Sequence, residues 1–221
     1  MNRFGYCERT DPAFWAEPLN ALSNGAFLLA ALAGFLLLRR SGQRDWPAVV
    51  LTGLVFAIGI GSFLFHTMPQ RWTLLADVVP IQLFAFLYFG LALQRFLGLS
   101  PAVASLGTLA FLAASLGLSA ALAPLLPPAA RGSAGYAGFA LALFGVAAAL
   151  RRRGFASGTA RLIGLAGLVF ALSLTLRSLD GVACSQVTFG LHWAWHLLNA
   201  TVLYLLLRAA ITHRRPAAGA G

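Results

Sequence analysis

The sequence has very little charge, and none of its positive charge comes from lysine. Charged residues make up 10% of the 221 positions and hydrophobic residues 59%, whereas an ordinary soluble domain has about 25% charged residues. This composition excludes a water-soluble globular enzyme. The absence of lysine also argues against a retinal-binding pump, because that chemistry needs a lysine Schiff base.

Cysteine is scarce as well. The chain has two cysteines, Cys7 and Cys184, which are too few for a disulfide scaffold or a cysteine-rich metal site. They could form a single bridge, or they could remain as two buried thiols.

Long apolar runs, by contrast, fill most of the chain. Crossing a bilayer takes about 20 apolar residues, and seven runs between arginine, proline and glycine are long enough. They cover residues 20–38, 47–66, 74–93, 101–122, 133–150, 160–176 and 189–207. We therefore predict an all-α integral membrane protein with seven transmembrane helices, one domain over residues 1–215 and a flexible tail over 216–221.

The sixteen positive residues are all arginines and give a net charge of +10. They lie at the ends of the apolar runs, which is typical of membrane orientation and not of nucleic-acid binding. Eleven lie in the connections on one side and five on the other, so we predict that the N-terminus is outside and the C-terminus is cytoplasmic. The two cysteines then share the outer side, where an oxidising compartment allows a disulfide.

The composition is rich in arginine, alanine, glycine and leucine, which hints at a bacterium with a GC-rich genome. We therefore expect a multi-pass protein of the bacterial inner membrane. Its polar residues should face the periplasm, because they cluster near the predicted outer side.

Three of the four histidines lie within apolar runs at a similar predicted depth. His66 ends the second run, and His192 and His196 lie in the first turns of the seventh. The spacing of four places His192 and His196 on one helical face. Three imidazoles with one open position are typical of a catalytic Zn²⁺ site, although imidazole also suits Fe, Cu and Ni. Haem fits less well, because two rings on one helical face cannot bind opposite faces of a porphyrin.

Two further polar residues lie near this group. Asp77 is the only carboxylate embedded in an apolar run, and Ser62 lies one helical turn before His66. Asp77 could transfer a proton between an attacking water and a leaving amine, or it could orient a metal ligand. Ser62 could donate to an oxyanion, or it could serve helix packing beside Gly59 and Gly61. The pattern predicts metal-assisted acyl transfer.

At these positions the chain resembles the alkaline ceramidase family. That family belongs to a superfamily of seven-helix membrane hydrolases that also holds adiponectin-type and progestin-type receptors and haemolysin III-like proteins. The superfamily pattern appears here as Ser62-Phe-Leu-Phe-His66, Asp77 and His192-Trp-Ala-Trp-His196. The resemblance at the family level rests on Tyr6-Cys7-Glu8, the stretch 16–24, Leu179-Asp180, Cys184 and Gly190.

The resemblance implies a role for each residue of the site. It implies that the three histidines bind Zn²⁺ and that Asp77 and Ser62 assist catalysis. The implied substrate is a ceramide-like lipid amide, which is hydrolysed to a fatty acid and a sphingoid amine. It also implies a disulfide between Cys7 and Cys184.

Eukaryotic relatives in the family carry a Ca²⁺ site in the N-terminal segment. The matching acidic residues are Glu8 and Glu17, and Asp11 could supply a further oxygen. Calcium needs six or more oxygen ligands, and two positions lack the expected ones: Gly5 and Thr10. The alternative is that the acidic residues form local caps or pair with the nearby arginines, Arg3 and Arg9.

A receptor or signalling protein on the same scaffold, with a structural zinc, is the alternative function. The open coordination position, together with Asp77 and Ser62, favours an enzyme. A channel or transporter would show polar residues throughout the bilayer depth, whereas here they gather at one end.

Overall fold

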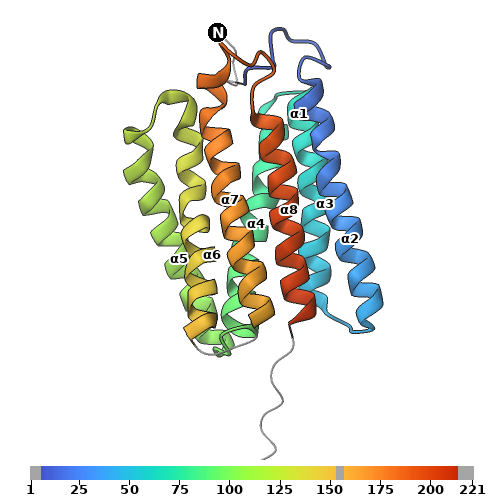
Figure 1. Cartoon of the computed structure of the whole chain (residues 1–221), viewed down its shortest axis with the longest axis vertical. Helices are drawn as coiled ribbons and strands as arrows, with labels where there is room; N and C mark the ends of the chain where they lie inside the picture. The colour runs from blue at the N-terminus through green and yellow to red at the C-terminus, as the bar shows by residue number, and fades with distance from the viewer. Residues whose placement is uncertain (1–5, 153–156, 214–221) are drawn as a thin grey trace, which may run out of the picture.

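The computed structural model describes residues 6–152 and 157–213, which form an up-and-down helical bundle (Figure 1). Within this part of the chain no strand occurs, and seven helical segments are long and apolar enough to cross a membrane. The predicted fold class is confirmed. The expected tail, 216–221, lies outside the described residues. The elements are α1 (Pro18–Ser23), α2 (Gly25–Ser41), α3 (Trp46–Thr67), α4 (Arg71–Arg95), α5 (Pro101–Leu122), η1 (Ala123–Leu125), η2 (Pro128–Ser133), α6 (Ala134–Arg152), α7 (Ser157–Ala183) and α8 (His192–Thr212).

The helices form a closed ring. Each long helix packs against the next one in the sequence, and α8 packs against both α7 and α2 (Figure 1). Short connections between antiparallel neighbours favour this arrangement. The segment before α1 crosses the end of the bundle where α3 ends and α8 begins, which we call the site end.

The outer surface of the ring is apolar. Large aliphatic side chains such as Leu106, Leu109 and Leu116 on α5 are more than 60% exposed. In water such a surface would be unfavourable, whereas it suits contact with lipid tails. The chain is therefore an integral, multi-pass membrane protein.

Two of the differences in extent between the helices and the predicted runs affect the site. The seventh run was predicted from residue 189, but α8 begins at His192 because Gly190 has a left-handed backbone, with φ 66°. The sixth run was predicted to end at 176, but α7 continues to Ala183. Arg177 and Asp180 are therefore part of a helix and not of a connecting loop.

An ion pair joins three helices at the end opposite to the site. Asp45 caps α3 by accepting from the Ala48 amide, and its carboxylate receives two hydrogen bonds from Arg95 at 2.6 and 2.8 Å. Arg95 also donates to the Ala210 carbonyl of α8. Burial opposes ionisation of Asp45, but the hydrogen bonds from Arg95 hold its pKa below the usual value.

Candidate metal centre and active site

Three histidines from two helices meet at the site end. His66 lies in the last turn of α3, and His192 and His196 lie in the first two turns of α8. Each offers one ring nitrogen, and these three nitrogens lie within 4.8 Å of one another. All three residues are buried, with at most 3% exposed. The structure thus brings together the residues that the sequence singles out as metal ligands.

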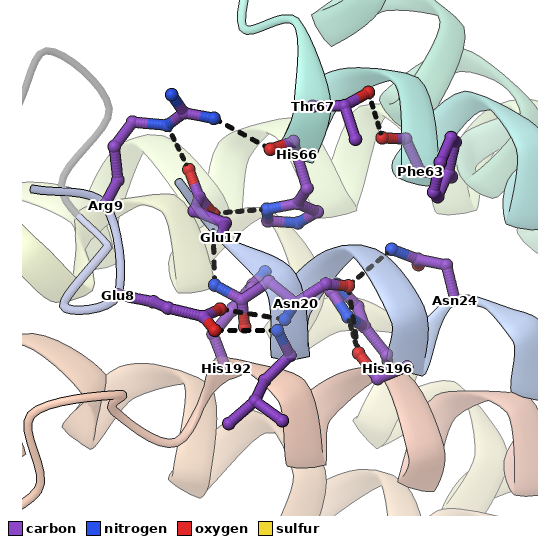
Figure 2. A network of polar contacts seen from close by, with 12 residues as sticks. Glu8, Arg9, Glu17, Asn20, Asn24, Phe63, His66, Thr67, His192 and His196 are labelled. Carbon is purple, nitrogen blue, oxygen red and sulfur yellow. Dashed lines mark hydrogen bonds and ion pairs between the residues drawn. The ribbon is translucent and has the colours of Figure 1, made fainter. Parts of the chain in front are cut away.

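Hydrogen bonds orient two of the three rings (Figure 2). The Nδ1 atom of His66 lies 2.6 Å from a carboxylate oxygen of Glu17, and the Nδ1 atom of His196 lies 2.8 Å from the Ser23 hydroxyl. Partners of this kind are typical of histidines that bind metals. They turn the opposite edge of each ring away from α1.

Two of the ring nitrogens have no hydrogen-bond partner in the part of the chain that the structure describes. These are the Nε2 atom of His66 and the Nδ1 atom of His192, and both are buried. A buried polar atom without a partner is costly. A metal ion shared by the three rings would satisfy these nitrogens, so the residues fit such an ion.

Tyr6 covers the histidines from the N-terminal segment. Its ring centre lies 4.1 Å from that of His192 and 5.1 Å from that of His66. Burial raises the pKa of Tyr6, so the hydroxyl stays neutral. The aromatic cover shields the three imidazoles from water, which strengthens electrostatic interactions beneath it.

Asp180 fixes the start of α8. One of its carboxylate oxygens accepts from the backbone amides of Leu191 and His192, at 2.6 and 3.0 Å. These are donors that the first turn of a helix otherwise leaves unpaired. A Cβ atom on Gly190 would overlap this same oxygen. The tight turn before α8 therefore requires glycine for two reasons: its backbone is left-handed, and there is no room for a side chain.

A disulfide joins the N-terminal segment to the loop that follows α7. It links Cys7 to Cys184, and the Cys7 amide also donates to Asp180 at 3.4 Å. The segment that carries Tyr6 is thereby tied to the residues that place His192.

Arg9 connects the same segment to α3 (Figure 2). Its Nε atom donates to Glu17 at 2.5 Å, and Nη2 donates to the His66 carbonyl at 2.7 Å. Its Nη1 atom donates to the carbonyls of Asp11 and Ala13. Burial opposes ionisation of Glu17, but hydrogen bonds from His66 and Arg9 hold its pKa below the usual value.

The residues expected at a calcium site do not fit a calcium ion. Among the described residues the three histidines are the only group of histidine, cysteine or acidic side chains suited to a metal. Glu17 is occupied by Arg9 and His66, and Glu8 accepts from the amides that follow Glu17 at 2.7 and 2.8 Å. Asp11 caps its own turn by accepting from a backbone amide. The structure therefore shows the alternative roles of the acidic residues, capping and pairing with Arg9.

Ser62 and Asp77 line the cavity that the histidines border. A Cβ atom on Gly61 would overlap the Ala76 carbonyl, so α3 and α4 approach each other closely at this point. This approach places the Ser62 hydroxyl where it interacts with the Asp77 carboxyl. The two roles expected of Ser62, helix packing beside Gly59 and Gly61 and a polar role in the site, are thus compatible.

The cavity continues from the histidines into the bundle. Asp77 and Ala92 of α4 both line it, so at 1.5 Å per residue its wall extends for about 22 Å. Below the polar end the lining is mainly apolar, with the Tyr88 hydroxyl among side chains such as Phe84, Phe111, Phe139, Val146, Ile163 and Leu206. The chemistry of this lining suits an acyl chain.

A family model described as Ceramidase matches residues 4–218, nearly the whole chain. The chain belongs to the Ceramidase family. Membership implies a hydrolase that acts on a lipid amide, and it confirms the resemblance found in the sequence motifs. No match was found among curated proteins or among solved structures.

Several residues of the ceramidase site were not identified as such from the sequence. Ser23 and Asp180 lie within stretches that carry the resemblance, but nothing in their spacing shows that they hold His196 and the start of α8. Arg177 directly follows the sixth predicted run, 160–176. The position of Arg177 next to an apolar run is the sequence feature that could have identified it as a site residue, because an ionisable group at membrane depth points to function.

Proposed function

We propose that this ceramidase-family chain is a zinc-dependent amide hydrolase, which cleaves ceramide-like N-acyl lipids to a fatty acid and an amine. One observation carries the proposal. Three buried histidines, two of them with unpartnered ring nitrogens, converge at the polar end of an apolar cavity that Asp77 and Ser62 also line.

The proposed ligands are His66, His192 and His196. Nitrogen donors alone suit zinc, which accepts three histidines and keeps one position open in catalytic sites. The chemistry that bound zinc supplies is polarisation of the amide carbonyl and of a water molecule.

The remaining steps belong to side chains of the chain itself. Asp77 accepts a proton from the attacking water and delivers it to the nitrogen of the leaving amine. Ser62 donates a hydrogen bond to the oxyanion that forms on the former carbonyl oxygen. The apolar wall binds the acyl chain and holds the amide beside these groups.

We also propose that the site end faces the periplasm of a bacterial inner membrane. The disulfide between Cys7 and Cys184 lies at this end, and disulfides persist in oxidising compartments. The excess of arginine in the connections at the opposite end supports the same orientation.

Elemental analysis of the detergent-purified protein, together with an amide-hydrolysis assay, tests the proposal. We expect one zinc per chain, fatty-acid release that a strong chelator abolishes, and loss of both zinc and turnover in His66→Ala, His192→Ala and His196→Ala. His213→Ala is the matched control, because His213 lies after the last turn of α8, at the end opposite to the site. Zinc without turnover of any amide would favour the receptor-type alternative, and protein without metal would overturn the proposal.

A further inference from the structure

Arg177 places a positive charge at the polar end of the cavity. It lies on α7 near the site end and lines the cavity together with Asp77, His192 and His196. Its Nη1 atom donates to the Ser133 hydroxyl at 2.9 Å.

Aromatic rings hold the guanidinium of Arg177 in place. Its central carbon lies 5.3 Å from the ring centres of both Tyr136 and Trp195. A Cβ atom on Gly132 would lie 3.2 Å from Nη2, so a side chain at that position would crowd the arginine. The guanidinium is therefore fixed beside the cavity and does not extend freely to the membrane surface.

No carboxylate in the described part of the chain forms an ion pair with Arg177. Among the described residues, Arg9 and Arg95 each form an ion pair with a carboxylate, whereas no acidic group lies within 4.0 Å of Arg177. Asp77 lines the same cavity and interacts with Arg177 electrostatically, but at a distance beyond that of an ion pair. Contacts with aromatic faces compensate a cation only in part, and a half-buried charge at membrane depth normally has a partner.

The guanidinium also has spare hydrogen-bonding capacity. An arginine carries five N–H donors in a planar fork, and the described part of the chain provides Arg177 with one acceptor, the Ser133 hydroxyl. A fork with free donors matches carboxylate and phosphate groups, which it binds through two parallel hydrogen bonds.

We propose that Arg177 binds an anionic group, a carboxylate or a phosphate, at the polar end of a lipid whose acyl chain fills the cavity. This inference rests on the proposed function, since it adds a specificity-determining residue to that site. The anion has two chemical sources. It is either the carboxylate of the released fatty acid or an acidic headgroup on the amine side of the substrate.

A binding measurement that needs no turnover tests the inference first. Palmitate and hexadecanol share an acyl length and differ in charge, and the shift in melting temperature that each causes is measured for wild type and Arg177→Met. We expect palmitate to raise the melting temperature of wild type more than hexadecanol does, and this difference to disappear in Arg177→Met. Arg131→Met, which removes an exposed arginine of η2 at the same end, should behave as wild type.

A second variant guards against a folding defect in Arg177→Met. Arg177→Gln keeps a donor for Ser133 but lacks the charge, and it should also lose the palmitate-specific shift. Equal shifts for both ligands in wild type, or an undiminished palmitate shift in both variants, would overturn the inference.

Hydrolysis of N-palmitoylglycine and N-palmitoylethanolamine distinguishes the two sources. If the anion is the headgroup, the kcat/KM of wild type is about tenfold higher for N-palmitoylglycine than for N-palmitoylethanolamine, which is the equivalent of one charge-assisted hydrogen bond. Arg177→Met then loses this preference. If the anion is the released fatty acid, the variant shows weaker inhibition by palmitate and unchanged selectivity. Palmitate-specific binding without hydrolysis of any amide would support the role of Arg177 and count against the proposed function alone.

Discussion

The side chain of Glu17 holds the ring of His66, with one carboxylate oxygen 2.6 Å from Nδ1. The same carboxylate accepts from Arg9 through its other oxygen. A single residue that precedes the first transmembrane segment thus fixes a candidate ligand on α3 and anchors the N-terminal segment.

Replacement of Glu17 by glutamine should weaken metal binding. The variant loses the negative charge that orients the His66 ring, and removal of such an outer partner typically lowers metal affinity by about 10- to 100-fold. Titration with a competing zinc chelator measures the change. Glu8→Gln is the matched control, because Glu8 accepts only backbone amides in the same segment. Equal zinc affinities in the two variants would contradict this role of Glu17.

Asp77→Asn should separate catalysis from metal binding. The amide cannot accept the proton of the attacking water, so we expect kcat to fall by about a hundred- to ten-thousand-fold. Zinc content should be unchanged, because the three histidines keep their geometry. Single-turnover kinetics and elemental analysis on the same preparation give both quantities. Loss of zinc in Asp77→Asn would instead assign Asp77 to the support of a metal ligand.

Added calcium should change neither the melting temperature nor the activity of zinc-loaded protein. The cation that ties the N-terminal segment to Glu17 is the guanidinium of Arg9, which is 5% exposed.

Arg9→Met should therefore destabilise the protein by about 3 kcal/mol, since it leaves the Glu17 carboxylate buried without this partner. Arg71→Met, at the exposed start of α4, provides the control. A rise in melting temperature of wild type on addition of calcium would show that this interpretation is wrong.

The pair Asp45–Arg95 predicts a specific dependence of stability on pH. The pKa of Asp45 is lower in the folded protein than its ordinary value, so the pair stabilises the fold above about pH 4 and this contribution is lost as the pH falls through the folded pKa. Above pH 5, Asp45→Asn should be less stable than wild type by about 1 kcal/mol. The melting temperatures of the two proteins should converge in more acidic solution, and parallel curves would contradict the prediction.

Gly190→Ala should disturb the start of α8. The new methyl group would meet the Asp180 carboxylate and the Cys7 side chain, and the left-handed backbone itself costs about 1–2 kcal/mol for a non-glycine residue. Gly98→Ala separates the two effects, because Gly98 has φ 69° but no atom within 4 Å of an added Cβ. We expect both variants to lose stability and only Gly190→Ala to lose zinc. Normal zinc content in Gly190→Ala would show that Asp180 and His192 tolerate the shift.

The sequence predicts the large features of this protein because each follows from local composition. Seven apolar runs predict seven helices, and the spacing of four between His192 and His196 places both rings on one helical face. The grouping of His66 with this pair follows from its depth in an antiparallel helix. These inferences need only the length of a helix and the thickness of a bilayer.

The partners of the histidines could not be predicted in the same way. Contacts such as Ser23 with His196 join residues that are 173 positions apart, and no periodicity encodes them. The role of Arg9 depends on how the irregular segment before α1 turns back toward α3. Several carbonyl groups that accept hydrogen bonds from Arg9 together fix this turn. The extension of α7 past residue 176 does not follow from the apolar run, because Arg177 interrupts the apolar pattern.

The closed ring has a consequence for the biosynthesis of the protein. Helix α2 leaves the ribosome before α3 to α7, whereas its neighbour α8 follows them. The two histidines of α8 therefore reach His66 only after α4 to α7 have been made. A nascent chain that ends before α8 contains a single histidine of the three, so it cannot complete the proposed metal site.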